Sequence, residues 1–261
     1  MSVPTSVFAT PAELGAALAT EIADGIAAAQ REGRRYVLGC PGGRTPRSTY
    51  QALARTVVDR GLGLSHVVIA MMDDYAVPAA DGGLAPAPAD AHYSCARFAR
   101  TEIAAPLSAA AADGGIGPDR VWLPDPADPA RYDDRLADAG GVDLFILASG
   151  ASDGHVAFNP PGTPFEARSR TVELADTTRQ DNLVTFPDFG GLDDVPRHGV
   201  TVGPRTIADQ SRRVVMVVHG DDKRAAAARI SAADGYEPEW PATVIAACTR
   251  PDLYVDAAAD R

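Results

Sequence analysis

Four short apolar runs along the chain are each followed at once by a polar segment that contains glycine or aspartate. The runs show little polar alternation, which is typical of strands buried on both faces. They cover residues 36–40, 67–72, 142–147 and 214–218, and the polar segments are 41–45, 73–75, 149–160 and 220–223. Helical patterns separate the runs. The sequence therefore predicts an α/β fold of three-layer, Rossmann-like type, with a mostly parallel sheet and helices on both faces.

The helical stretches carry recognisable start signals. Residues 10–13, Thr-Pro-Ala-Glu, match a capping box with proline in the first turn, and leucine or isoleucine then recurs every fourth residue from 14 to 26. The other expected elements are a second helix capped by Thr45-Pro46, helices near 95–103 and 128–140 and after Lys223, a long loop at 76–91 and a last strand at 253–255.

Residues 1–261 show no internal repeat, heptad run or domain-sized linker, so we expect a single domain. In parallel α/β sheets, ligands bind beyond the carboxyl ends of the strands. All four polar segments belong to that edge in the predicted sheet. Their gathering there favours an enzyme or a sugar-binding module.

Composition excludes several classes of partner. The chain has 24 basic and 35 acidic residues, a net charge of −11, which argues against nucleic acid or an anionic membrane. No apolar stretch has the length of a membrane span, and the N-terminus has no secretory signal. Three sparse cysteines, Cys40, Cys95 and Cys248, suit a reducing compartment, so we expect a cytoplasmic protein.

A small anionic ligand remains compatible with this charge. Gly42, Gly43 and Arg44 offer backbone N–H groups beside the Thr45 hydroxyl and a helix start, which together suit an anion, although a plain tight turn also explains them. Lys223 is the only lysine. A cation at a helix start is unfavourable unless an anion is near. Either the two preceding aspartates or a bound phosphate would supply that anion.

The second and third polar segments carry acid–base groups. Asp73 and Asp74 are adjacent, so in an extended segment one carboxylate enters the cleft as a candidate general base and the other anchors the loop. His155 titrates near neutrality, and Asp153 can orient its imidazole across a glycine bend. A solvated acidic turn and a satisfied loop histidine are the alternatives. The sequence offers no second metal ligand here and no GxSxG elbow.

In this order, the four segments resemble the glucosamine-6-phosphate deaminase/6-phosphogluconolactonase family over roughly residues 10–257. The resemblance rests on LGCPGGRTPRSTY (38–50), MMDDY (71–75), SGASDGHVAFNPPG (149–162) and VVHGDDKRAAA (217–227), with weaker support from TTRQDN (177–182) and VPRHGVTVG (195–203). The motifs DGHVAFN and TTRQDN favour the deaminase branch, whereas Val77-Pro78 slightly favours the lactonases.

The resemblance implies a role for each motif. Asp73 would move a proton between C2 and C1 of the open-chain sugar. His155, with Asp153 as its partner, would open the pyranose ring. The implied ligands of the 6-phosphate are Gly42, Gly43, Thr45 and Lys223, with Arg44 beside them.

Three positions depart from the family pattern. Pro160 replaces the glutamate that usually follows FN and helps to polarise the histidine. Val184 stands where an arginine usually clamps the phosphate, and Val172 replaces the lysine of allosteric deaminases despite Arg170 nearby. Conversely, arginine replaces small residues at two positions, either of which could restore a cationic clamp. These arginines and the remaining candidate substrate contacts are Arg44, Arg205, Asp74, Asn159, Arg179 and His198.

The leading hypothesis is a sugar-phosphate isomerase/deaminase that converts glucosamine 6-phosphate, or a close amino-sugar phosphate, to the ketose phosphate and ammonia. Enediol chemistry of this kind needs a carboxylate, a histidine and an anion site, so we expect no metal or organic cofactor. The alternatives are a 6-phosphogluconolactonase-like hydrolase and a non-catalytic sugar-phosphate-binding protein. The expected partner is a small anionic sugar phosphate, and a homo-oligomer is left open.

Overall fold

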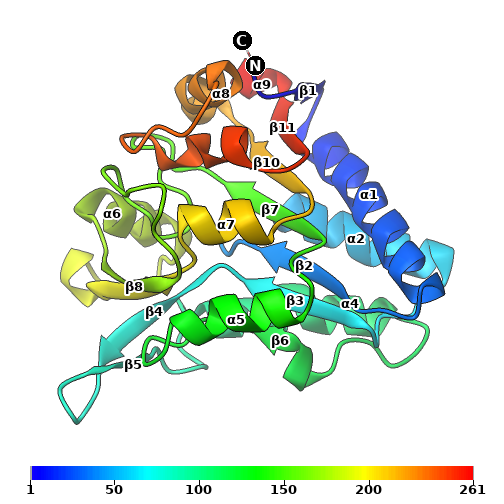
Figure 1. Cartoon of the computed structure of the whole chain (residues 1–261), viewed down its shortest axis with the longest axis horizontal. Helices are drawn as coiled ribbons and strands as arrows, with labels where there is room; N and C mark the ends of the chain where they lie inside the picture. Colours follow the sequence, from blue (N-terminus) through cyan, green and yellow to red (C-terminus); the bar gives the residue numbers. More distant parts are fainter. Residues whose placement is uncertain (1, 261) are drawn as a thin grey trace.

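The computed structural model describes residues 2–260, and within that range the molecule is built around a parallel sheet of seven strands (Figure 1). The strand order is β1-β11-β10-β7-β2-β3-β6, and every neighbouring pair runs parallel. The strands are β1 (Thr5–Phe8), β2 (Tyr36–Cys40), β3 (Val67–Met71), β6 (Val121–Trp122), β7 (Leu144–Ala148), β10 (Val214–Val218) and β11 (Pro251–Asp256). The predicted Rossmann-like fold class is confirmed.

Helices cover both faces of the sheet because the strands are apolar on both sides. One apolar layer joins alternate strand residues to α1 (Pro11–Arg31), α2 (Arg47–Arg60), α3 (Cys95–Phe98) and α4 (Ala105–Ala110). The other layer joins the intervening strand residues to α5 (Ala130–Asp138), α7 (Pro204–Gln210), α8 (Arg224–Ala232) and α9 (Ala257–Asp260). A π-helical stretch, Ala99–Ala104, interrupts the helix expected near 95–103.

A second, antiparallel sheet, which the sequence did not predict, lies beyond the main one. Its order is β5-β4-β9-β8, from β4 (Asp73–Pro78), β5 (Leu84–Pro86), β8 (Arg170–Glu173) and β9 (His198–Thr201), and α6 (Asp176–Thr185) follows β8. The expected loop at 76–91 is therefore wrong in part, because it holds the end of β4 and all of β5. These strands are short and rich in alanine and proline, so no apolar alternation marks them.

The two predicted helix caps have different outcomes. Thr10 caps α1 as expected, since its Oγ1 accepts a hydrogen bond from the Glu13 N–H at 3.2 Å. Thr45 does not cap α2. That helix has Pro46 at its N-cap and no side-chain cap, and the Thr45 hydroxyl instead accepts a hydrogen bond from Lys223.

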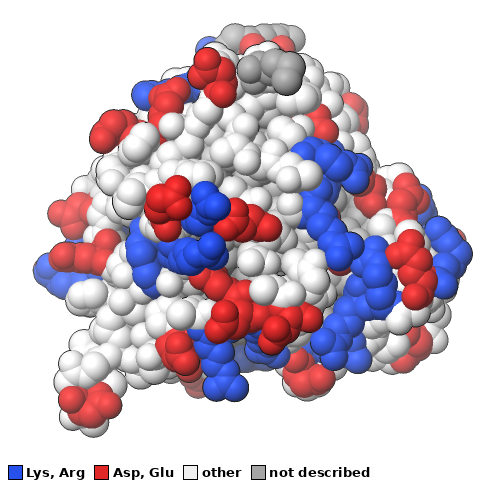
Figure 2. Space-filling model, viewed as in Figure 1, with Lys and Arg blue, Asp and Glu red and all other residues white. Residues whose placement is uncertain are grey.

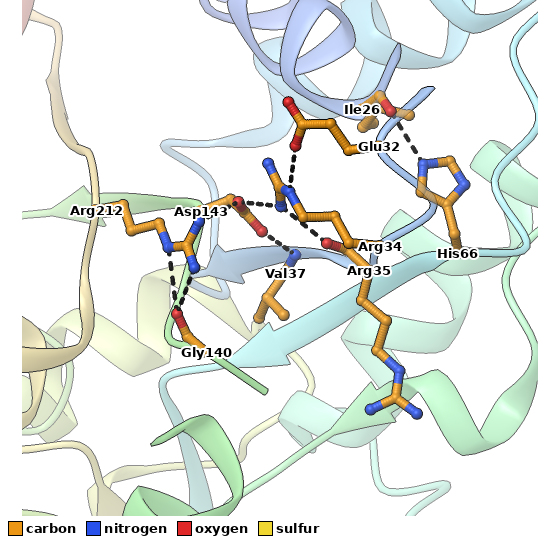
Figure 3. A network of polar contacts seen from close by, with 9 residues as sticks. All are labelled: Ile26, Glu32, Arg34, Arg35, Val37, His66, Gly140, Asp143 and Arg212. Carbon is orange, nitrogen blue, oxygen red and sulfur yellow. Dashed lines mark hydrogen bonds and ion pairs between the residues drawn. The ribbon is translucent and has the colours of Figure 1, made fainter. Parts of the chain in front are cut away.

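A polar network fastens β2 to β7 at their amino ends (Figure 3). Asp143 Oδ2 accepts a hydrogen bond from the Val37 N–H at 2.8 Å, and its Oδ1 pairs with Arg34 at 2.6 Å. Arg34 also pairs with the exposed Glu32. These contacts fix the two central strands at one end, while their carboxyl ends carry the glycine-rich segments.

The surface carries charges of both signs. On the face in Figure 2, basic side chains form a band on the right of the view and carboxylates gather at the lower centre, with smaller groups of both signs around them. Within residues 2–260, no helix is both long and apolar enough to cross a membrane.

Candidate active site

One cavity of about 180 Å³ opens at the carboxyl ends of the central strands. It lies where the chain connections leave β2 and β7 in opposite directions, which is the usual ligand position in an open α/β sheet. All four predicted polar segments contribute to its wall. The lining residues used below are Gly42, Gly43, Arg44, Thr45, Asp73, Tyr75, Cys95, His155, Phe158, Thr178, Asp181, Asn182, Thr185, Phe186 and Lys223.

Lys223 reaches into this cavity from the 3₁₀ turn that precedes α8. Its ammonium donates to the Ser149 carbonyl at 2.8 Å and to Thr45 Oγ1 at 3.3 Å. No carboxylate of residues 2–260 lies within ion-pair distance of it. Burial lowers the pKa of Lys223, although Asp222 and Asp181 act against this. The cation is therefore oriented by neutral oxygens and its charge is left for an anionic ligand.

The segment after β2 adds backbone donors and a second cation to the same end of the cavity. Gly43 adopts a φ of +84°, a left-handed conformation that favours glycine. The N–H groups of Gly42, Gly43 and Arg44 donate no hydrogen bond to another described residue. Arg44 lines the cavity and is otherwise exposed, it forms no ion pair in the described part of the chain, and its charge lowers the pKa of Lys223. This end of the cavity suits a phosphate.

Asp73 and Asp74 divide their roles as the alternation of an extended strand requires. Asp73 lines the cavity with only 6% of its surface exposed. Burial raises its pKa to about 7, assisted by the charge of Asp74 and opposed by Cys95 and His155. Asp74 points away from the cavity and accepts hydrogen bonds from the N–H groups of Tyr75 and Cys95, both at 2.8 Å. It thus anchors the start of α3.

His155 and Asp153 form a close pair in the segment after β7. His155 Nδ1 lies 2.7 Å from Asp153 Oδ1, and Thr177 on α6 donates to Asp153 Oδ2 at 2.7 Å. Burial alone would raise the pKa of Asp153, but the hydrogen bonds from His155 and Thr177 outweigh it and hold the pKa below its usual range. Gly154 makes the bend, with a φ of +65° and no room for a Cβ against Trp240.

Besides Asp74, four residues predicted as substrate contacts lie outside the cavity lining. Buried Asn159 donates to the carbonyls of Val156 and Val202 and accepts from Arg170. Arg179 and Arg205 are held by other residues, and His198 lies in β9. Arg179 is bound by Asp176 and the Leu192 carbonyl, half-buried Arg205 pairs with Asp209, and His198 pairs in register with Ala76 and Glu173.

The sequence did not single out α6 as a wall of the cavity. Thr178, Asp181, Asn182 and Thr185 line it at the i, i+3, i+4, i+7 spacing of one helix face. Asn182 Nδ2 is buried without a hydrogen-bond partner in residues 2–260, so it is a further donor for a ligand. Val184 lies off this face and is 62% exposed. The helical spacing of polar residues within 178–185 is the sequence pattern that could have indicated this wall.

Aromatic side chains form the remaining side of the cavity. Tyr75 packs against Phe158 and Phe186 with ring centroids 5.1 and 6.2 Å apart. The same cluster continues through Tyr93 and Phe189. These aromatic residues are far apart in the sequence, and the second sheet brings them together. The sequence analysis therefore did not identify them as part of the site. No group of three or more His, Cys, Asp or Glu side chains in the described range is placed to hold a metal ion.

Comparison with known proteins identifies this arrangement. The family model described as glucosamine-6-phosphate isomerases/6-phosphogluconolactonase matches residues 9–254. The chain belongs to this family. The predicted resemblance, and with it the prediction of an enzyme, is confirmed.

Relatives include deaminases and lactonases. A glucosamine-6-phosphate deaminase of Shouchella clausii is 32% identical over 213 residues, covering 81% of this chain and 79% of the relative. A solved monomeric glucosamine-6-phosphate deaminase superposes with a TM-score of 0.83 at 25% identity, covering 98% of both chains. A 6-phosphogluconolactonase of Trypanosoma brucei has a TM-score of 0.68 at 23% identity, over 99% and 98% of the chains, and supports the fold alone.

Proposed function

We propose that this protein converts glucosamine 6-phosphate, or a close amino-sugar phosphate, to the ketose 6-phosphate and ammonia. The observation that carries the proposal is a buried carboxylate, Asp73, in the same small cavity as His155 and an unpaired lysine, Lys223. The relatives named glucosamine-6-phosphate deaminase support the choice of reaction. The free thiols Cys40, Cys95 and Cys248 support a cytoplasmic site of action.

In this proposal the phosphate binds between the segment after β2 and Lys223. The N–H groups of Gly42 and Gly43, the Thr45 hydroxyl, the Lys223 ammonium and the Arg44 guanidinium surround that end of the cavity. Arg44 takes the place of the family arginine that is absent at Val184. The charge of these groups selects a phosphorylated sugar.

His155 opens the sugar ring and Asp73 performs the isomerisation. His155, oriented by Asp153, moves a proton between the C1 hydroxyl and the ring oxygen, which gives the open-chain aldehyde. Asp73 removes the proton from C2 and returns it to C1, while a proton passes from the C2 amino group to O1, which leaves an imine at C2 and a hydroxyl at C1. Water then hydrolyses this imine to the ketone and ammonia. A base with a pKa of about 7 suits proton transfer near neutrality.

Pro160 stands where the family usually has a glutamate that helps to polarise the histidine. In this chain Thr177 instead donates a hydrogen bond to Asp153, the partner of His155. Its hydroxyl holds Asp153 Oδ2, so the carboxylate stays aligned with the imidazole. We propose that Thr177 replaces part of the lost ordering. Efficient ring opening then depends on α6 being docked against the cavity.

Ammonia release from a panel of amino-sugar phosphates tests the proposal. We expect turnover of glucosamine 6-phosphate, and loss of apparent affinity for it in Lys223→Met because the phosphate loses its buried cation. Absence of ammonia release across the whole panel would contradict the proposed reaction. Tight sugar-phosphate binding by titration calorimetry without turnover would indicate the non-catalytic alternative.

Lactone hydrolysis is the second candidate, and Pro160 is the observation that favours it. In that reaction His155 would activate water against the lactone carbonyl while Lys223 holds the phosphate. Pro160→Glu discriminates between the two. We expect it to raise deamination, since it restores the family carboxylate. A change in lactone hydrolysis alone would favour the hydrolase.

A further inference from the structure

Cys95 lines the cavity, and its thiol is within hydrogen-bond distance of the proposed catalytic base. It is the first residue of α3, is 5% exposed, and lines the same cavity as Asp73. Its Sγ lies 3.5 Å from Asp73 Oδ1. Its backbone N–H donates to Asp74 Oδ1 at 2.8 Å. A single residue therefore contacts both carboxylates of the pair, through different atoms.

The thiol is a donor at this position. Burial raises the pKa of Cys95, and the charges of Asp73 and Asp74 raise it further, so the group stays protonated in the working range. A protonated thiol has one weak S–H donor, and Asp73 Oδ1 is within its reach. Asp73 lines the cavity, and its Oδ2 accepts no hydrogen bond from any residue of the 2–260 range.

We infer that Cys95 is a positioning residue for the proton transfer: its S–H holds Asp73 Oδ1 and presents Oδ2 to the substrate. This inference rests on the proposed function, in which Asp73 is the base. The carboxylate accepts the C2 proton on Oδ2 and returns the same proton to C1, so the thiol is neither consumed nor oxidised. Removing the donor disfavours ionised Asp73 and lets the carboxylate rotate.

Other groups around Asp73 set the background for this effect. Asp74 and Tyr75 follow Asp73 on β4, and His155 approaches it from the segment after β7. The charge of Asp73 also raises the pKa of Tyr50 on α2 and of Tyr132 on α5. Replacing Cys95 leaves all five in place. A change in the acidic limb of the pH profile then reports on the thiol.

The experiment compares Cys95→Ala, Cys95→Ser and wild type in the pH profile of kcat/KM for ammonia release from glucosamine 6-phosphate. We expect alanine to move the acidic limb to higher pH by about half to one unit, since it removes one hydrogen bond to the ionised base. Serine keeps a donor and restores the limb. Cys248→Ala, a thiol that bonds only to the Val244 carbonyl, is the matched control and leaves the limb unchanged.

The result that overturns the inference is a limb at the same pH in Cys95→Ala as in wild type, whatever the loss of rate. If wild type releases no ammonia, the proposed function fails and the inference is judged on the carboxylate itself. Titration of Asp73 by carboxyl ¹³C NMR, assigned with Asp73→Asn, then shows whether Cys95→Ala raises its midpoint. An unmoved midpoint contradicts the contact directly.

Discussion

At the scale of single residues, two aspartates in the same site have pKa values displaced in opposite directions. Burial raises the pKa of Asp73 to about 7, because few donors compensate for its desolvation. Asp153 is also desolvated, but hydrogen bonds from His155 and Thr177 hold its pKa below the usual range. One carboxyl group can therefore exchange protons near neutrality, while the other stays ionised and orients the imidazole.

The two arginines that the sequence offered as phosphate clamps make a matched pair for mutation. Arg44 lines the cavity, whereas Arg205 lies outside it and pairs with Asp209 on α7. We expect Arg44→Met to raise KM for the sugar phosphate about 10- to 100-fold, the range for loss of a charged hydrogen bond. Arg205→Met should leave KM unchanged in the same steady-state assay. Equal effects of the two substitutions would remove Arg44 from the phosphate end.

At the scale of elements, the predicted part of the site is the part that follows strands of the main sheet. The segments at 41–45, 73–75, 149–160 and 220–223 each contribute residues to one cavity, because a parallel sheet brings the ends of its strands to one edge. The face of α6 and the aromatic wall could not be predicted, since they depend on the second sheet. Its strands pair over only three or four residues each and carry no periodic signal, so tertiary contacts fix them.

Substitutions in the polar network at the amino ends of β2 and β7 should lower the stability of the protein and leave its activity unchanged. Asp143→Ala leaves the Arg34 guanidinium and the Val37 N–H without their partner, so we expect a loss of about 1–3 kcal/mol in the free energy of unfolding. Glu32→Ala removes only an exposed ion pair and should cost less than about 1 kcal/mol. Urea unfolding measures both. A fall in kcat of folded Asp143→Ala would show that the amino end of the sheet is coupled to the site.

At the scale of the whole molecule, a negative net charge is compatible with a cavity that is lined by cationic side chains. The net charge is −11, and the face in Figure 2 carries both a band of basic side chains and a group of carboxylates. The cavity holds Lys223 and Arg44 without an ion-pair partner in the range 2–260. The early exclusion of nucleic acid stays a prediction from the overall charge, which says little about the pocket itself.

The buried carboxyl pair should also shape the pH dependence of folding. The pKa values of Asp73 and Asp74 are raised to about 7 and about 6, so the folded protein binds these protons more tightly than the unfolded chain. Their contribution to stability is therefore lost as pH rises from about 4 to 7. Asp73→Asn should be more stable than wild type at pH 8, by up to about 4 kcal/mol, and similar at pH 4. Denaturant unfolding at both pH values decides, and an equal or lower stability at pH 8 contradicts the burial argument.

The most direct test of the account is one side-by-side assay of glucosamine 6-phosphate deamination and 6-phosphogluconolactone hydrolysis, with Asp73→Asn and His155→Ala. We expect wild type to release ammonia and to hydrolyse the lactone poorly. Asp73→Asn should lose about 10²- to 10⁴-fold in kcat for deamination, the usual contribution of a general base. His155→Ala should lose activity chiefly on the closed-ring sugar. Lactone hydrolysis in wild type that survives Asp73→Asn, without ammonia release, would contradict the account.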